Sequence, residues 1–272
     1  MDCLDRLCVH TVTCQPWKLE EAVAHFAAAG VRGITTWREA VAGRDLAEAR
    51  RLITDAGLTV VSHCRGGFFP AMEAAGRRKA IDENRTVIDE AAALGAPVVV
   101  LVCGATPGQP LETSRAQIAE GIAAVLPHAQ AAGVRLAIEP LHPMYAGDRS
   151  AVNTLRQANE MCAQLDSPAL GVALDVYHVW WEPGLEAEIR ASGEAGTLLA
   201  FHVCDWLLPT EDLLLDRGLM GEGCIDIAQI RRWVEAAGFG GWIEVEIFSK
   251  RHWARDQAAF LAEIVRAYSD HV

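Results

Sequence analysis

Apolar stretches alternate with helix-like segments along the whole chain, and this alternation predicts its architecture. We expect eight strands, each too apolar to leave one face in water, at 7–13, 32–37, 59–64, 97–103, 134–140, 170–176, 198–204 and 241–248. Several segments between them end in an Ala-rich turn followed by glycine, as in HFAAAG and AQAAGV. Glycine there suits the left-handed residue that ends a helix. The pattern predicts an α/β fold, a single (β/α)8 TIM-barrel domain over residues 1–272.

The main alternative is an open, doubly wound sheet. Such a sheet is expected to carry a glycine fingerprint after its first strand, and the segment TVTCQPWKLEE contains no GxGxxG. The closed barrel is therefore favoured. Active sites of such barrels form at the carboxyl ends of the strands, so the polar residues at those ends become the candidates.

Composition limits the location and the partners. Lys plus Arg number 24 and Asp plus Glu number 36, a net charge of −12 that disfavours nucleic acid as a partner. No stretch approaches the ~18 consecutive apolar residues of a membrane span, and the N-terminus MDCLDRLCVH lacks the pattern of a signal peptide. The eight cysteines are scattered without a CxxC pair, which favours reduced thiols. We therefore expect a cytoplasmic protein with a small-molecule substrate and no membrane partner.

Ionisable residues gather at the predicted strand ends, above all in the second half of the chain. In order, the ends bring His10, Trp37, His63 with Arg65, Cys103, Glu139, Asp175 with His178, His202 with Asp205, and Glu246. Each could be a helix cap or a core residue when taken singly. Together, three carboxylates and an imidazole at one rim would be costly to desolvate without a cation or a hydrogen-bond network. Such a set suits Mn²⁺, Mg²⁺, Co²⁺ or Zn²⁺.

The last predicted strand, GWIEVEIF, carries two glutamates on one face. Glu244 and Glu246 are two residues apart, so in a strand they point the same way, roughly 7 Å apart. Glu246 is nearer the carboxyl end and belongs with the candidate ligands. Glu244 lies one layer deeper, where we expect a structural acid that is paired inside the barrel.

These motifs resemble a known family, the xylose isomerase-like TIM barrels described as sugar phosphate isomerases and epimerases. The resemblance spans nearly the whole chain and is strongest in IEPLHP, LDVYH, HVCDW, DRGLMGEGCIDI and EVEIF. In the epimerases of that family, the Glu of E-P-L, the Asp of D-x-x-H, the His of H-x-x-D and the Glu of a final E-x-F bind one divalent metal. The resemblance implies one ion, most readily Mn²⁺, at Glu139, Asp175, His202 and Glu246.

The same resemblance implies the chemistry. Glu139 and Glu246 would take and return a proton on a carbon beside a carbonyl, and the metal would stabilise the resulting enediolate. His178 and Arg217, the latter on the loop after the seventh strand, would contact the substrate. The implied activity is that of a metal-dependent isomerase or epimerase of a keto sugar or related polyol.

Further substrate contacts are expected from position. They are His63, which closes the third strand, and His142 in EPLHPMY. His142 and Tyr145 stand where ketose epimerases carry other contacts, which argues against a ketohexose-specific enzyme. Arg65 could meet a carboxylate or phosphate or be an ordinary surface residue. Trp206 belongs to a group of aromatic residues after strand ends. These could stack on a sugar, pack loops onto the barrel or form a homo-oligomer contact.

Three alternatives share this fold. A metal-dependent dehydratase or lyase acting on a keto-inositol or 3-keto sugar would begin with the same proton abstraction. A repair enzyme like endonuclease IV would need more histidine ligands, for several zinc ions, and a basic face. A non-catalytic carbohydrate sensor would be expected to have lost a ligand, and all four are present in the sequence.

Overall fold

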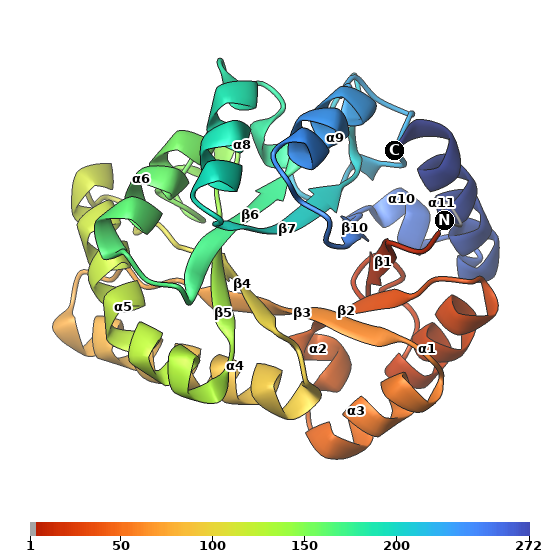
Figure 1. Cartoon of the computed structure of the whole chain (residues 1–272), viewed down its shortest axis with the longest axis horizontal. Coiled ribbons are helices and arrows are strands. Elements are labelled where there is room, and N and C mark those ends of the chain that lie inside the picture. The colour runs from red at the N-terminus through yellow and green to blue at the C-terminus, as the bar shows by residue number, and fades with distance from the viewer. Residues whose placement is uncertain (1–3) are drawn as a thin grey trace.

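The predicted closed barrel of parallel strands is present in the computed structural model, which describes residues 4–272. Its order is β1-β10-β7-β6-β5-β4-β3-β2, so the first and last strands pair directly and close the barrel (Figure 1). The barrel strands are β1 (Leu7–His10), β2 (Gly33–Trp37), β3 (Thr59–Gly67), β4 (Val98–Val102), β5 (Arg135–Glu139), β6 (Leu170–Asp175), β7 (Leu198–Val203) and β10 (Ile243–Val245).

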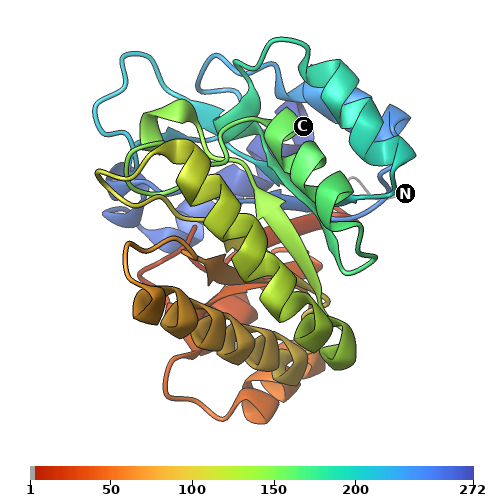
Figure 2. The ribbon, with the colours of Figure 1, turned by 90° about the vertical axis from the view of Figure 1, so that its left-hand side faces the viewer.

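Helices surround the barrel on the outside (Figure 1). The longer ones are α1 (Leu19–Ala28), α3 (Leu46–Asp55), α4 (Ala74–Leu94), α5 (Leu111–Ala132), α6 (Leu155–Leu165), α8 (Leu185–Glu194), α9 (Ile227–Ala236) and α11 (Gln257–His271). Figure 2 shows α4 and α5 packed side by side on one outer face. They end at Gly95 (φ 77°) and Gly133 (φ 69°), left-handed residues that confirm the predicted glycine caps. None of the helices in residues 4–272 combines the length and apolar character needed to cross a bilayer.

Short elements decorate the carboxyl ends of the strands, where the candidate residues lie. They are α2 (Arg38–Val41), the 3-10 turn η1 (Pro143–Tyr145), α7 (Val176–Val179), α10 (Lys250–Trp253) and the two-stranded ribbon of β8 (Asp205–Trp206) with β9 (Arg217–Gly218).

The first and last strands are shorter than the sequence pattern predicts. After Val245 the Thr13 side chain replaces backbone pairing between the first and last strands. Its hydroxyl donates to the Val245 carbonyl (3.0 Å) and accepts from the Ile247 amide (3.0 Å). The chain therefore leaves the barrel just where Glu246 begins, and this carboxylate lies at the rim.

Alternation along each strand separates an outer core from a narrow inner one. Outward-facing residues of the strands join the helices in one large apolar cluster. The inner cluster is small and holds little bulk, since three of its six residues are Ala137, Ala173 and Ala200. One inward position further along the same strands come Glu139, Asp175 and His202.

Glu244 is buried inside the barrel, as the sequence predicts, and the structure identifies its partners. One oxygen, Oε2, accepts from the Thr35 hydroxyl (2.6 Å) and the Ser62 hydroxyl (2.8 Å) and lies 3.1 Å from His10 Nε2. Burial alone would raise the pKa of Glu244, but His202 and the hydrogen bond with His10 leave it below its ordinary value. Glu244 therefore ties β10 to β1, β2 and β3 as an ionised group.

We predict that Glu244→Gln lowers the free energy of unfolding of the metal-free protein by about 1–3 kcal/mol, because buried donors lose a charged acceptor. The loss should shrink as the pH falls through the lowered pKa of Glu244, where the wild type also loses the charge. Urea unfolding at several pH values measures this. Glu194→Gln serves as the control, because Glu194 is exposed and forms no ion pair with any residue in 4–272, and we expect it within about 0.5 kcal/mol of wild type. Equal stabilities for the two variants would contradict the assigned role.

Candidate metal centre and active site

Four residues from four strands meet at the carboxyl end of the barrel. Glu139 ends β5, Asp175 ends β6, His202 lies in β7 and Glu246 follows β10. One ligand atom from each lies within 4.8 Å of the others, and all four side chains are buried. The structure thus brings together the residues that the motifs predict as a metal site.

The cluster is linked internally. His202 Nδ1 lies 2.9 Å from Glu139 Oε1. Its other ring nitrogen, Nε2, has no hydrogen-bond partner among residues 4–272 and lies 3.8 Å from Glu244 Oε1. The imidazole therefore stands between the rim carboxylate and the deeper one. The contact at Nδ1 holds the ring, because a hydrogen bond at one imidazole nitrogen fixes its orientation.

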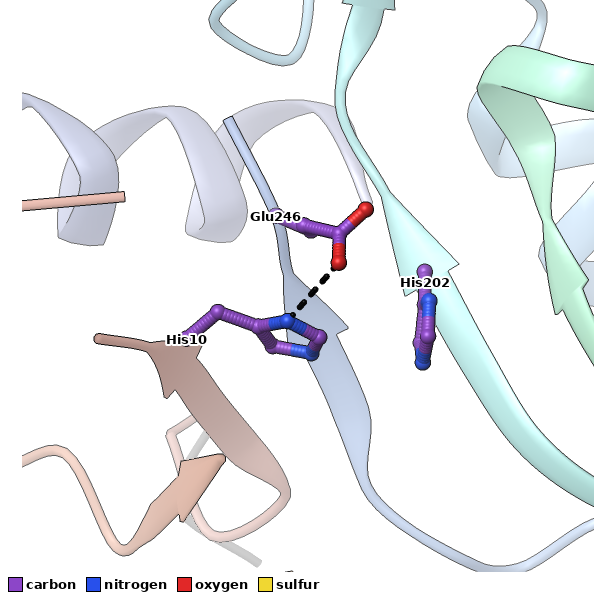
Figure 3. Close-up of side chains that lie close together, drawn as sticks. All are labelled: His10, His202 and Glu246. Atoms are coloured by element: carbon purple, nitrogen blue, oxygen red, sulfur yellow. Dashed lines mark ion pairs between the residues drawn. The ribbon is translucent and has the colours of Figure 1, made fainter. Parts of the chain in front are cut away.

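His10 also belongs to the cluster, although its sequence position alone predicts no role for it. Figure 3 shows it reaching from β1 toward Glu246, with Nδ1 3.0 Å from Oε1, beside the His202 ring. Its Nε2 contacts Glu244, so His10 bridges the two glutamates of the last strand. Burial would lower the pKa of His10, but Glu246 and hydrogen bonds with Cys64 and Glu244 raise it well above the ordinary value. Its position at a strand end places His10 at the rim, but its contact with Glu246 follows only from the direct pairing of β1 with β10.

Arg217 lies inside the cluster rather than on a solvated loop. Its Nη1 donates to Asp175 Oδ2 (3.0 Å) and Glu246 Oε2 (2.9 Å), and its plane stacks on Tyr177 and Phe248. Asp205 holds the segment that carries it, accepting from the amides of Gly221, Gly223 and Ile225. A buried arginine with two carboxylate partners is an anchored cation.

His178 is neutral beside this arginine. Burial, then Arg217, lowers its pKa well below the ordinary value. Because arginine only donates, the contact of 3.2 Å from Arg217 Nη2 makes His178 Nε2 the acceptor, and the ring proton then belongs on Nδ1. Nδ1 is buried and has no hydrogen-bond partner in the described part of the chain, so its proton is unused there.

Negative charge exceeds positive charge in the cluster. Burial raises the pKa of Asp175, and Glu246 and Glu139 add to this against the effect of Arg217, so it reaches about 7. Burial would lower the pKa of His202, but Glu244 and Glu139 raise it to about 9. Both shifts favour proton uptake beside surplus carboxylates. A divalent cation would satisfy the same need, and a donor set of three carboxylates and one imidazole fits such an ion.

The cluster opens onto a cavity of about 660 Å³. Glu139, Glu246, His178 and Arg217 line its deep end. Its walls include Trp37 and Trp253, which both lie against Phe248, another lining residue. A cavity of this size accommodates a small sugar-like molecule.

Three expected substrate contacts do not line this cavity. His63 points away from the barrel axis and bonds the Thr36 hydroxyl (2.8 Å), with Glu90 of α4 at 3.4 Å from its Nε2. His142 and Trp206 pack against each other, with ring centroids 4.9 Å apart, as part of an aromatic layer under the loops. These three residues are loop-packing or core residues in this structure.

The cysteines of residues 4–272 are free thiols, as the sequence predicts. Cys64, Cys103 and Cys204 at the strand ends are fully buried, and burial raises the pKa of each. They belong to the packed core and stay protonated, so they lie outside the proposed ligand set.

Comparisons with known proteins agree with the fold. Protein SMc04130 from Sinorhizobium meliloti 1021 is 50% identical, with a TM-score of 0.95 over 98% of both chains. An inosose isomerase of Halalkalibacterium halodurans is 26% identical over 194 residues, 68% of this chain and 65% of that protein, so the match spans under two thirds of that relative. A solved IolI protein with a bound zinc atom shares the fold at 20% identity, with a TM-score of 0.82 over 98% of this chain and 99% of that one.

The family model described as xylose isomerase-like TIM barrel matches residues 23–264, which is most of the chain. The expected resemblance is thereby confirmed, and this protein belongs to the xylose isomerase-like TIM barrel family.

Proposed function

We propose that this protein is a divalent-metal-dependent isomerase or epimerase that acts on a keto sugar or related polyol. The observation that best supports this proposal is the buried set of Glu139, Asp175, His202 and Glu246 at the deep end of an open cavity. The similarity to an inosose isomerase and to a zinc-bound IolI protein supports an isomerase reaction and a divalent ion. A cytoplasmic location belongs to the same proposal and is supported by the free thiols.

The same four residues would hold the metal, most readily Mn²⁺ because the set is rich in oxygen. When bound, such an ion supplies Lewis-acid polarisation of a substrate carbonyl and spreads the negative charge that develops on its oxygen.

Glu139 and Glu246 are the proposed proton carriers. They come from β5 and β10, which are separated by β6 and β7 in the barrel, so they approach a molecule in the cavity from different sides. Burial would raise the pKa of Glu246, but His10 and Arg217 hold it well below the ordinary value. Glu246 is thus ionised, the state in which a carboxylate accepts a proton.

His178 and Arg217 would orient the substrate. His178 lines the cavity beside Arg217, and the contact with Arg217 Nη2 holds its ring in place. Trp37 and Phe248 offer apolar walls for the C–H face of a sugar. The reaction centre would then be fixed between the two glutamates.

We expect the metal-free protein to bind one Mn²⁺ per chain, followed by loss of the free Mn²⁺ signal in electron paramagnetic resonance. Asp175→Asn should weaken this binding by more than about tenfold, because a charged ligand is lost. Asp226→Asn is the matched control, since Asn can still cap α9. An unchanged affinity in Asp175→Asn would remove the proposed centre.

Substitution of the two glutamates of the last strand should affect kcat to different extents. Glu246→Gln should lower kcat by roughly 10²–10⁴-fold, as expected for loss of a general base, with a circular dichroism spectrum like that of the wild type. Glu244→Gln should retain a larger share of kcat at a temperature where it is folded, since its carboxylate lies one layer below the cavity end. A greater kcat loss in Glu244→Gln would reverse these assignments.

Turnover in D₂O tests the reaction type. With a panel of ketoses, keto-inositols and 3-keto sugars, we expect deuterium at a carbon next to the carbonyl, detected by mass spectrometry and NMR. A product that differs only by deuterium identifies an isomerase or epimerase, whereas loss of water identifies the dehydratase alternative. Conversion without deuterium uptake, where transferred protons exchange freely, would favour a hydride shift and exclude the two-glutamate mechanism.

A further inference from the structure

The outer part of the cavity is basic, although the whole chain is acidic with a net charge of −12. Five cationic side chains line the cavity, against three carboxylates. Two of those carboxylates, Glu139 and Glu246, belong to the proposed metal site, and the third, Glu39, is exposed. The outer walls of the cavity therefore carry a local excess of positive charge.

Two of the arginines have no carboxylate partner. Within residues 4–272, neither Arg65 nor Arg149 has an acidic oxygen within 4.0 Å, although both are only partly exposed. Arg44 lines the same cavity but is paired through both terminal nitrogens with Glu20, at 2.5 and 2.8 Å. Arg217 is likewise committed to Asp175 and Glu246. The donors of Arg65 and Arg149 are therefore available.

Aromatic faces hold both guanidinium groups. Arg65 Cζ lies 4.3 Å from the ring centroid of Phe68, and Arg149 Cζ lies 5.6 Å from that of Tyr145. Stacking uses the face of a guanidinium and leaves its N–H edge free for a planar or tetrahedral anion.

The backbone brings the two segments to one place. The Phe68 amide donates to the Val102 carbonyl (2.8 Å), and the Ala151 amide donates to the Gly104 carbonyl (2.9 Å). The loop after β3 and the loop after β5 are thus both fastened to the end of β4, next to the residues that follow Arg65 and Arg149. The arginines are positioned without any ligand.

The two arginines are partly buried cations without an anionic partner among the described residues, which is electrostatically unfavourable. Burial lowers the pKa of Arg65; Glu39 opposes the shift and the charge of Arg149 adds to it. Two partly desolvated like charges on one cavity wall repel each other, and an anion between them would relieve both the repulsion and the lost hydration.

We propose that Arg65 and Arg149 form an oxyanion subsite, and that the substrate is a keto sugar or polyol carrying a phosphate or carboxylate group remote from the reacting carbonyl. This inference rests on the proposed function for the carbonyl half of the substrate. The subsite itself depends only on the two arginines, because neither of them belongs to the proposed metal site.

The test measures calorimetric binding of three matched polyols to the metal-free protein at fixed ionic strength. The probes are D-sorbitol, D-sorbitol 6-phosphate and D-gluconate, which differ in having no charge, a phosphate or a carboxylate. We expect at least one anionic probe to bind about tenfold or more tightly than D-sorbitol, and Arg65→Met and Arg149→Met each to remove about tenfold of that affinity. Arg65→Lys and Arg149→Lys should recover part of it. Arg44→Met should bind like wild type.

The preferred anion then distinguishes a phosphorylated substrate from a sugar acid, and either preference supports the subsite. Equal affinity for all three probes would overturn it, as would an Arg44→Met loss as large as that of Arg65→Met, which would indicate only a diffuse potential. Thermal unfolding verifies that each variant is folded. Because no metal or turnover is involved, a failed deuterium experiment with intact anion binding refutes the proposed reaction and leaves the subsite standing.

Discussion

The repulsion among four buried carboxylates is the constraint on which the carboxyl end of this barrel depends. Glu139, Asp175, Glu244 and Glu246 project inward within two layers, where water cannot solvate them. Arg217 and two histidines with raised pKa values, His10 and His202, offset this negative charge. These cations are distributed so that each carboxylate touches at least one of them. The fold thus tolerates a concentration of acid that a barrel of apolar layers would exclude, and it does so at the place where a divalent ion would add the missing charge.

The two layers, one with Glu244 and one with Glu246, have different roles. Glu244 Oε2 is engaged by Thr35, Ser62 and His10, and Glu244 does not line the cavity. Glu246, one layer above, shares its oxygens with His10 and Arg217 and also faces the cavity. His10 contacts both glutamates, so the lower layer sets the orientation of the side chain that holds the upper one. Stability and proposed chemistry are therefore coupled through one imidazole.

The sequence predicted the barrel and the four-residue cluster because both follow from regular spacing. Period-two alternation and strand-end position suffice to bring Glu139, Asp175 and Glu246 to one rim. His63 was misplaced for a related reason. Both faces of β3 are apolar enough that the pattern does not say which face is inward, and the register also shifts where β3 pairs with β2 and β4. Ser62 and Cys64 take the inward positions, so His63 points toward α4.

Loop residues were harder still, because their neighbours are set by tertiary contacts. Arg149 follows a 3-10 turn, and its segment lies near that of Arg65 because both are bonded to the end of β4. The result is a cavity whose deep end would hold the metal and whose outer wall carries two arginines without carboxylate partners in residues 4–272. Their attraction for an anion would orient a substrate that has one anionic end before any specific contact forms. Neutral sugars would gain nothing from it, and the unpaired arginines are then explained by selection among substrates rather than by stability.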